Sequence, residues 1–367
     1  MNAIVSAGLS AASSLYGAVA SRRRAWYVRS PDRQRRLRQP VISVGNLSVG
    51  GSGKTPVVAH LARMLQAFGE RPAILSRGYG RRVQDDGVTV VSDGTQVRAD
   101  FDHAGDEPLM LARALPGVPV VVASERHLAG RLAESQLGAT VHLLDDGFQH
   151  VQLWRDINLL VIDAADLTDH VLPAGRLREP LSAAHAADAV LTTSDDAGLV
   201  ATVRAQLGVT DVFPIVRRLD PVRMLSSGTI VEPATVGPVF AAAGIARPQR
   251  FLDDLAAAGW HVAGSLLFRD HHRFRPADVM RLAEAARDAQ THVIVTTEKD
   301  AVRLEGLNPA SLALAVAPLS AAIVPADLFA AWLRERLGRA RLPRSPLERL
   351  DRARPLDGGR APGPEPR

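Results

Sequence analysis

The sequence lacks cysteine and has almost no lysine. A 367-residue chain without cysteine forms no disulfide and no thiolate metal site, so any metal must be held by oxygen or imidazole ligands. Only two of the 44 basic residues, Lys54 and Lys299, are lysines. A compact ammonium and a planar guanidinium bind their partners differently. A lysine retained in such an arginine-rich chain therefore indicates a position where the smaller cation is needed.

The chain also lacks a strongly apolar run long enough to suggest a membrane span. Residues 3–20 are uncharged and place apolar residues at helical spacing, but serine, glycine and alanine dilute them. Residues 21–40 then carry eight arginines against one aspartate. We interpret residues 1–38 as an interfacial helix and basic segment that contact anionic lipid headgroups. The alternative is a helix docked on the protein's own core.

The net charge of +5 does not indicate nucleic acid, because the excess of arginine is local. No zinc finger, RNP aromatic motif or other known reader accompanies it, so we expect no nucleic-acid partner. Residues 339–367 are rich in arginine and proline and cannot bury enough apolar area to fold. They are predicted to form a disordered tail.

Short β-branched runs alternate with helical patterns from residue 40 onward. The runs PVISVG, VPVVVAS and INLLVIDA are typical of strands buried on both faces, and PVVAHLARMLQAFG is helical. This alternation predicts an α/β fold with a mostly parallel sheet between helices. We expect residues 39–215 to form that domain and residues 216–338 to form a second, smaller α/β domain.

The stretch SVGNLSVGGSGKTPV, residues 43–57, predicts a buried strand, a glycine-rich loop and a helix start. It matches the phosphate-loop signature G-x-x-x-x-G-K-[ST] at Gly53, Lys54 and Thr55, with Ser48 in place of the first glycine. Backbone N–H groups of such a loop bind phosphate oxygens at a helix N-terminus, which predicts a P-loop NTPase-type sheet. The predicted nucleotide-binding residues are Ser48, Val49, Gly50, Gly51, Ser52, Gly53, Lys54 and Thr55.

An acidic strand end supplies a magnesium partner for this loop. VHLLDDGFQH ends an apolar run in Asp145 and Asp146, the pattern of a Walker B strand, and Thr55 adds a hydroxyl ligand. Adjacent side chains of a strand point to opposite faces, so at most one of the two carboxylates should face the metal. Nucleoside triphosphate and Mg²⁺ are the expected ligands.

The motifs SVGNLSVGGSGKTPV, SRGYGR, GDEP, DDGFQH, LPAGRLREP, FRDHHRF and TEKDAV occur in an order that closely resembles the tetraacyldisaccharide 4'-kinase family. The resemblance runs from about residue 3 to about residue 335. It implies a P-loop kinase domain joined to a smaller α/β domain, with the active site between them. It also implies transfer of the γ-phosphate of ATP to the 4'-hydroxyl of tetraacyldisaccharide 1-phosphate, a lipid A precursor, to give lipid IVA.

The resemblance further assigns catalytic residues. It implies a proton-accepting pair of Asp106 in GDEP and His271 in FRDHH, a carboxylate tuned by an imidazole. It places Lys54, Arg77 and Arg126 at the phosphates, where cations stabilise the transition state. The implied magnesium residues are Thr55, Glu107, Asp145 and Asp146, and further matches near the site are Gln149, His150, Arg178 and Glu179.

Lys299 in TEKD does not form the guanine motif [NT]-K-x-D, because Lys299 and Asp300 are adjacent. An ion pair at the domain interface is the simpler interpretation of Lys299. A P-loop ATPase acting as a nucleotide-controlled switch is the alternative function, and it leaves GDEP and FRDHH unexplained.

An acceptor that carries four acyl chains stays in the membrane, so the enzyme must come to it. The N-terminal segment would then place the cleft at an anionic surface. We expect a peripheral monomer at the cytoplasmic face of the inner membrane, consistent with a chain free of cysteine.

Overall fold

A computed structural model describes residues 3–51, 53–83, 87–305, 307 and 312–342. The predicted loop residue Ser52 and the predicted tail from residue 343 onward lie outside these ranges.

The larger domain is built on a nine-stranded sheet in the order β14-β8-β7-β6-β1-β5-β2-β4-β3. Its pairings are parallel except at its two ends, where β3 pairs with β4 and β14 with β8 in antiparallel fashion. The strands are β1 Val41–Asn46, β2 Pro72–Ser76, β3 Val88–Asp93, β4 Pro119–Ala123, β5 Val141–Asp145, β6 Ile157–Ile162, β7 Ala189–Thr192, β8 Val212–Leu219 and β14 Leu319–Ile323. The predicted mostly parallel α/β sheet is confirmed.

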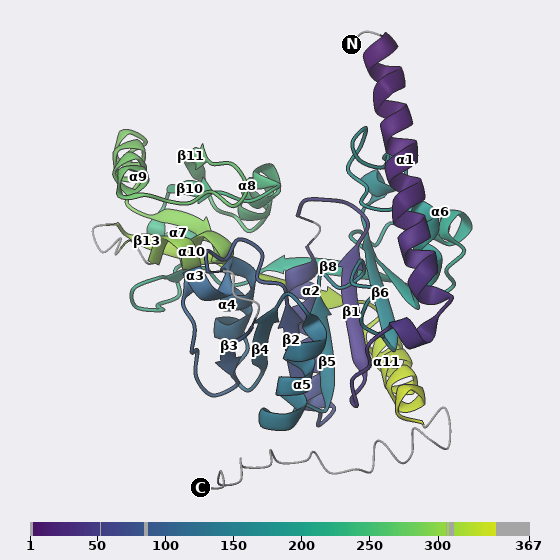
Figure 1. Cartoon of the computed structure of the whole chain (residues 1–367). Helices are drawn as coiled ribbons and strands as arrows, with labels where there is room; N and C mark the ends of the chain where they lie inside the picture. The colour runs from purple at the N-terminus through teal and green to yellow at the C-terminus, as the bar shows by residue number, and fades with distance from the viewer. Residues whose placement is uncertain (1–2, 52, 84–86, 306, 308–311, 343–367) are drawn as a thin grey trace, which may run out of the picture.

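Helices cover both faces of this sheet (Figure 1). On one face, α2 Lys54–Ala67, α4 Asp106–Ala114 and α11 Ala326–Arg341 share a single apolar core with the strands. On the other face, α5 Arg126–Gln136 and α6 Ala197–Leu207 pack in two separate clusters. The central strands are buried along their whole length, and most of their residues are apolar because both of their faces are covered.

The smaller domain has its own five-stranded sheet in the order β11-β10-β12-β13-β9. Its strands are β9 Arg223–Met224, β10 Val239–Ala243, β11 Val262–Leu267, β12 Ile294–Thr297 and β13 Leu314–Ala317. Its helices are α7 Pro233–Val236, α8 Pro248–Ala257, α9 Pro276–Asp288 and α10 Glu298–Glu305. The remaining helices in the described ranges are α1 Ala3–Val28, α3 Phe101–Ala104 and the 3-10 turns Pro31–Arg33, Ala164–Asp166 and Leu181–Ala186.

The chain crosses between the domains twice, which corrects the predicted boundaries. It leaves the large sheet after β8 and returns in β14, which pairs with β8 from Leu319↔Leu219 to Ile323↔Ile215. The apolar face of α11, with Phe329 and Leu333, then packs on the core of the larger domain. Residues 319–341 therefore belong to the larger domain, and α11 runs past residue 339, where the tail is predicted to begin.

Helix α1 lies along one side of the larger domain and projects beyond it (Figure 1). Arg24 fixes it by a buried bidentate pair with Glu179, at 2.6 and 2.9 Å, and by a hydrogen bond to the Phe148 carbonyl. Leu15, at 69% exposure, and Val19, at 60%, remain open to solvent. Among the described residues, no helix has the length and apolarity needed to cross a bilayer.

Gly45 lets the segment after β5 pack directly against β1. A Cβ added at Gly45 would lie 2.5 Å from Phe148 Cβ and 2.7 Å from the Phe148 nitrogen. We expect Gly45→Ala to lower the free energy of unfolding by about 1–3 kcal/mol, because an overpacked core forces the backbone to shift.

Denaturant unfolding measures this loss, and Gly338→Ala in α11 is the matched control. A Cβ at Gly338 meets nothing within 4 Å, so the substitution should stabilise the helix by roughly 0.5–1 kcal/mol. Equal effects at the two glycines would contradict the close approach.

Candidate active site

The glycine loop is anchored at its start and open at its end. Ser48 is 2% exposed and pairs with Leu177, and the Val49 N–H donates to the Arg176 carbonyl at 2.8 Å. The Val49 N–H is therefore committed within the protein, which corrects the prediction that it binds phosphate. The Ser48 side chain accepts a hydrogen bond from Asn46, so serine serves here as a buried anchor.

Gly50 and Gly53 have φ angles of 99° and 76°, in the region that favours glycine. Gly53 caps α2, whose first residue is Lys54. The open end of the loop therefore leads directly into the N-terminus of α2. A phosphate site needs this arrangement, because the backbone N–H groups at a helix N-terminus bind phosphate oxygens.

Lys54 is held between an amide and a carboxylate. Its Nζ donates to Asn46 Oδ1 at 2.7 Å and lies 3.3 Å from Asp146 Oδ1. Arg178 contacts the same two groups, with 2.6 Å to Asn46 Oδ1 and 2.9 Å to each oxygen of Asp146. Asn46 was not predicted as a site residue, although it ends the strand that precedes the loop.

Asp145 and Asp146 differ sharply in their surroundings. Asp146 leaves the strand with a φ of 52°, and although burial opposes its ionisation, Lys54 and Arg178 hold its pKa well below the usual range. Asp145 is buried at the end of β5, and its side chain has no hydrogen-bond donor among the described residues. Burial, followed by the charges of Glu107 and Asp146, raises the pKa of Asp145 to about 7.

These carboxylates fit a single Mg²⁺ ion shared with a nucleotide. In the part of the chain that the structure describes, no three acidic or histidine side chains form a closed metal cage. Mg²⁺ in phosphoryl-transfer sites needs only one or two carboxylates, because phosphates and water complete its shell. The buried and poorly compensated Asp145 is a carboxylate that a divalent cation would stabilise.

Asp106 and His271, from different domains, are in contact. Asp106 begins α4, and its Oδ2 lies 3.0 Å from His271 Nδ1. Asp106 Oδ1 accepts the Glu107 N–H at 2.9 Å. His271 has a φ of 56°, which is uncommon outside glycine, and its ring meets Tyr79 edge-on at 5.0 Å. The two residues lie 165 positions apart and meet as the family resemblance implied.

Two cations of α10 complete this cluster and were not predicted as site residues. Arg303 is buried and bridges Asp106, Asp300 and the Gly244 carbonyl. Lys299 Nζ lies 3.2 Å from both His271 Nε2 and Glu107 Oε1. The interface ion pair proposed for Lys299 exists, and it borders the Asp106–His271 pair.

Charge governs the protonation of the cluster. Burial opposes ionisation of Asp106, but the His271 hydrogen bond and the Lys299 and Arg303 charges hold its pKa well below the usual range. Burial also opposes the charge of Lys299, whereas the carboxylates of Glu107, Asp106 and Asp270 raise its pKa. Asp106 is therefore ionised and Lys299 protonated at neutral pH.

Arg126 lies near Asp145 and Asp146, and Arg77 lies near Arg126. Arg126 begins α5 and is buried; burial and the charge of Arg77 lower its pKa to about 10, against the opposing effects of Asp146 and Asp145. Its Nε has no hydrogen-bond partner among the described residues. Burial and nearby arginines, Arg126 first, lower the pKa of His150 to about 3, so its imidazole is neutral at pH 7.

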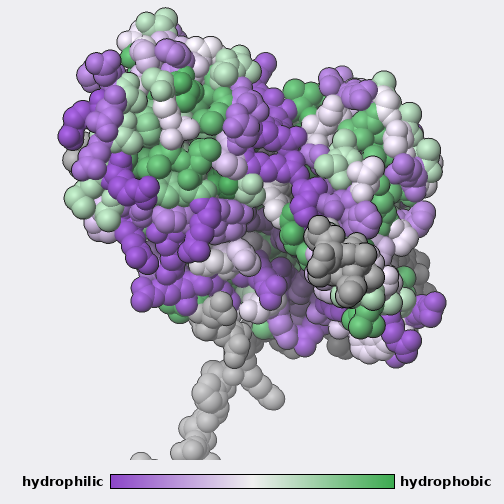
Figure 2. Space-filling model, turned by 90° about the horizontal axis from the view of Figure 1, so that it is seen from above, coloured by the Kyte–Doolittle hydropathy of each residue, from purple (hydrophilic) through white to green (hydrophobic). Residues whose placement is uncertain are grey.

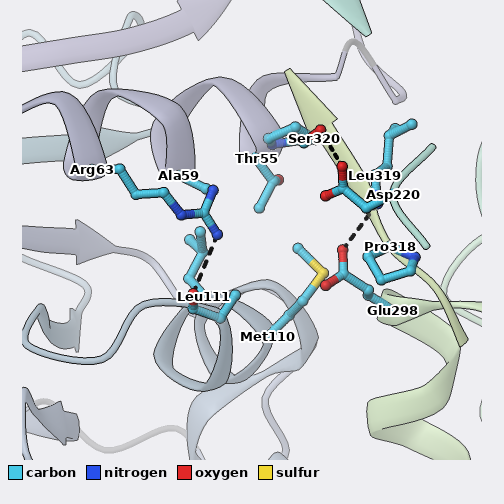
Figure 3. A pocket seen from close by; sticks show the side chains of 12 residues that line it. Thr55, Ala59, Arg63, Met110, Leu111, Asp220, Glu298, Pro318, Leu319 and Ser320 are labelled. Carbon is cyan, nitrogen blue, oxygen red and sulfur yellow. Dashed lines mark hydrogen bonds between the residues drawn. The ribbon is translucent and has the colours of Figure 1, made fainter. Parts of the chain in front are cut away.

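The cavities show where a ligand fits. The pocket in Figure 3 lies beside Thr55, where α2 and α4 face the two crossing segments, and its volume of about 40 Å³ excludes a nucleotide. A second pocket of about 700 Å³ borders Tyr79 and His271 and is lined by the arginines Arg269, Arg273 and Arg275. Figure 2 shows the molecule from above as two masses separated by a hollow with mostly hydrophilic walls.

A phosphate loop, a carboxylate at the end of the adjacent strand and an Asp–His pair spanning two domains define a P-loop phosphotransferase. The family model described as tetraacyldisaccharide-1-P 4'-kinase matches residues 5–338. The chain belongs to this kinase family.

Relatives and a solved structure agree with this assignment. Tetraacyldisaccharide 4'-kinases from Geobacter sulfurreducens and Bradyrhizobium diazoefficiens are 39% and 43% identical, over 82% and 80% of this chain and 85% and 81% of theirs. LpxK from Aquifex aeolicus, solved in complex with ATP, has 31% identity and a TM-score of 0.73, covering 90% of this chain and 99% of that one.

Among the side chains of the Asp106–His271 cluster, removal of Arg303 should lower the free energy of unfolding the most. Arg303→Met leaves Asp106 and Asp300 buried without their shared cation, and breaking a buried ion pair costs about 3–5 kcal/mol of unfolding free energy. Denaturant unfolding checks this expectation.

The matched control is Arg113→Ala, which breaks an exposed arginine–carboxylate pair, Arg113–Glu305, across the same domain boundary. Exposed pairs contribute about 0–1 kcal/mol. If Arg303→Met lost no more than this control, the structural role of Arg303 would be wrong.

Proposed function

We propose that the chain transfers the γ-phosphate of ATP to the 4'-hydroxyl of tetraacyldisaccharide 1-phosphate, giving lipid IVA. The observation that carries this proposal is the 3.0 Å contact between Asp106 and His271, which puts a proton-accepting pair on the domain boundary beside the phosphate loop. Membership of the kinase family and the ATP complex of the Aquifex relative support it. A nucleotide switch would have no use for this pair.

On the donor side, the Lys54 ammonium leaves Asp146 and binds the outer phosphates when ATP enters. Its hydrogen bond to Asn46 keeps it directed toward the loop. Gly50, Gly51, Gly53 and Thr55 line the phosphate path. Thr55 and Asp145 would hold Mg²⁺, which would neutralise charge on the outer phosphates. Glu107 would support the ion through water, and Asp146 fixes Arg178.

On the acceptor side, the hydroxyl loses its proton to the Asp106–His271 pair. The Asp106 side chain is only 3% exposed and its Oδ2 already accepts two hydrogen bonds, whereas the His271 side chain is 29% exposed. This burial favours transfer to the imidazole Nε2, which exchanges the Lys299 ammonium for the hydroxyl, with ionised Asp106 stabilising the positive charge that forms on the ring. In this proposal the imidazole, and not the carboxylate itself, accepts the proton.

Arg77 and Arg126 stabilise the charge that develops on the transferred group. Arg126 is preplaced by burial and has an unpartnered Nε, so it needs little reorganisation during the reaction. Arg126 is close enough to Asp145 and Asp146 to interact with them electrostatically, and Arg77 is close enough to act on Arg126.

Asp106→Ala should abolish most of the phosphoryl transfer while ATP still binds. Loss of general-base catalysis lowers kcat by roughly 10²–10⁴-fold. The measurement pairs transfer of labelled phosphate to the lipid with ATP titration of the same protein.

Asp102→Ala is the control for that experiment, since it removes an exposed carboxylate that also contacts the smaller domain, at Arg273. It should keep nearly full activity. A wild-type chain that hydrolyses ATP but never labels the lipid would count against the proposed acceptor.

Helix α1 would bring this cleft to the membrane surface. Exposed Leu15, Val19 and Trp26 project from a helix whose C-terminal half is rich in arginine. That combination supports peripheral binding to anionic lipid at the cytoplasmic face of the inner membrane. Both halves of the site come from one chain, which supports a monomer as the active form.

Replacing Leu15 and Val19 together by glutamate should release the protein from vesicles that contain anionic lipid. The charges remove the apolar face and oppose the negative surface. Co-sedimentation gives the bound fraction, and Leu328→Glu, on an equally exposed leucine of α11, is the control. Equal loss of binding in the control would refute the role of α1.

A further inference from the structure

The order of the strands indicates where the nucleoside end of ATP would lie on the larger domain. The γ-phosphate must face Asp145, at the end of β5, and the Asp106–His271 pair. In the sheet, β5 lies on one side of β1, and β6 and β7 lie on the other. Ligands of open α/β sheets bind across the carboxyl ends of the strands. The α-phosphate and the nucleoside should therefore extend over the ends of β6 and β7.

A cluster that the predicted site did not include lies at this place. Asp163 directly follows β6, and its Oδ2 accepts a hydrogen bond from Thr193, which follows β7, at 3.1 Å. Two arginines of the smaller domain reach the same oxygen, Arg247 Nη1 at 2.8 Å and Arg250 Nη2 at 3.4 Å. These contacts join the two domains on the nucleoside side of the cleft.

The segment that carries the arginines also touches the phosphate loop. Arg247 precedes α8 and follows Ala246, and a Cβ built on Gly51 would lie 3.2 Å from Ala246 Cβ. The same segment begins at Gly244, whose N–H donates to Asp300 and whose carbonyl accepts from Arg303. It is therefore fixed on one side by the catalytic cluster and rests on the loop at the other.

The charges of the cluster do not balance. Two guanidinium groups share one carboxylate, which leaves an excess positive charge beside the path of a polyphosphate. The Arg247 and Arg250 side chains are 29% and 35% exposed, whereas that of Asp163 is 13% exposed. The arginines are thus free enough to move to a ligand, and the carboxylate is not.

We propose that Arg247 and Arg250 bind the α-phosphate end of the nucleotide, exchanging Asp163 for phosphate oxygen when ATP enters the cleft. The proposal rests on the kinase function only in taking ATP as the ligand. It assigns the smaller domain a direct part in nucleotide binding besides its part in proton transfer. The competing interpretation is a latch between the domains that never touches the nucleotide.

Nucleotide titrations of the full chain separate these interpretations. Arg247→Ala should weaken the binding of ATP and of ADP by the same factor, about tenfold or more, because the α-phosphate is common to both and a charge-assisted bond is lost. Arg247→Lys should lose less, which guards against a folding defect in the alanine variant. Arg113→Ala, at the exposed pair on the other side of the boundary, should change neither affinity.

Asp163→Asn distinguishes most clearly between direct binding of the nucleotide and a latch between the domains. It removes the resting partner of the arginines, so nucleotide affinity should hold or rise, whereas a latch predicts the same loss as Arg247→Ala. Equal losses in Asp163→Asn and Arg247→Ala, or unchanged affinities in Arg247→Ala, would overturn the proposal. A loss confined to ATP would place the contact at the γ-phosphate and overturn the assignment to the α-phosphate.

If the proposed kinase function is wrong, the experiment gives a different result from the failure of the Arg247 proposal. In that case the wild-type chain would not label the lipid at saturating ATP, whatever the nucleotide affinities of the Arg247 variants. If the proposal holds, Arg247→Ala should still label the lipid once ATP is raised above its weakened dissociation constant.

Discussion

The hydrogen-bonded contact among Asp106, Arg303 and His271 is the constraint on which the rest of the site depends. Asp106 belongs to the larger domain, and the other two belong to the smaller one. A carboxylate this deeply buried stays ionised because the His271 hydrogen bond and the charges of Lys299 and Arg303, all from the opposite domain, stabilise it. The proton-accepting pair therefore exists only when the two domains meet, which couples chemistry to the geometry of the cleft.

A second hydrogen-bonded network connects the N-terminal helix with the phosphate loop. Arg24 of α1 pairs with Glu179, and Gln149 donates both to Glu179 and to the Asn46 carbonyl. Asn46 in turn accepts the hydrogen bond of Lys54. The helix with the exposed apolar residues and the lysine of the nucleotide site are thus joined by one connected set of polar groups.

Local sequence patterns predicted the elements whose chemistry lies within a few consecutive residues. The strand ending at Asn46, the glycine loop and the helix from Lys54 are adjacent in sequence, so their pattern is visible there. The acidic end of β5 could be predicted from the sequence for the same reason. Asp106 and His271 came from family motifs, because neither has a local signal that distinguishes it from other acids and histidines.

What the sequence did not reveal depends on contacts between distant segments. Arg303 is one of many arginines, and only the fold places it against Asp106, 197 positions away. Lys299 was notable as a rare lysine, but its contact with His271 depends on how α10 meets the loop after β11. The return of β14 to the large sheet was missed because an apolar strand fits either sheet equally well by pattern alone.

The central claim is that Asp106 and His271 act as one proton-accepting unit. A double-mutant cycle on kcat/KM for lipid phosphorylation, with Asp106→Ala, His271→Ala and the double variant, tests it most directly. Residues that act as a unit are strongly non-additive, so the double variant should be little slower than the slower single variant. If the two losses multiply instead, the side chains work independently and the claim is wrong.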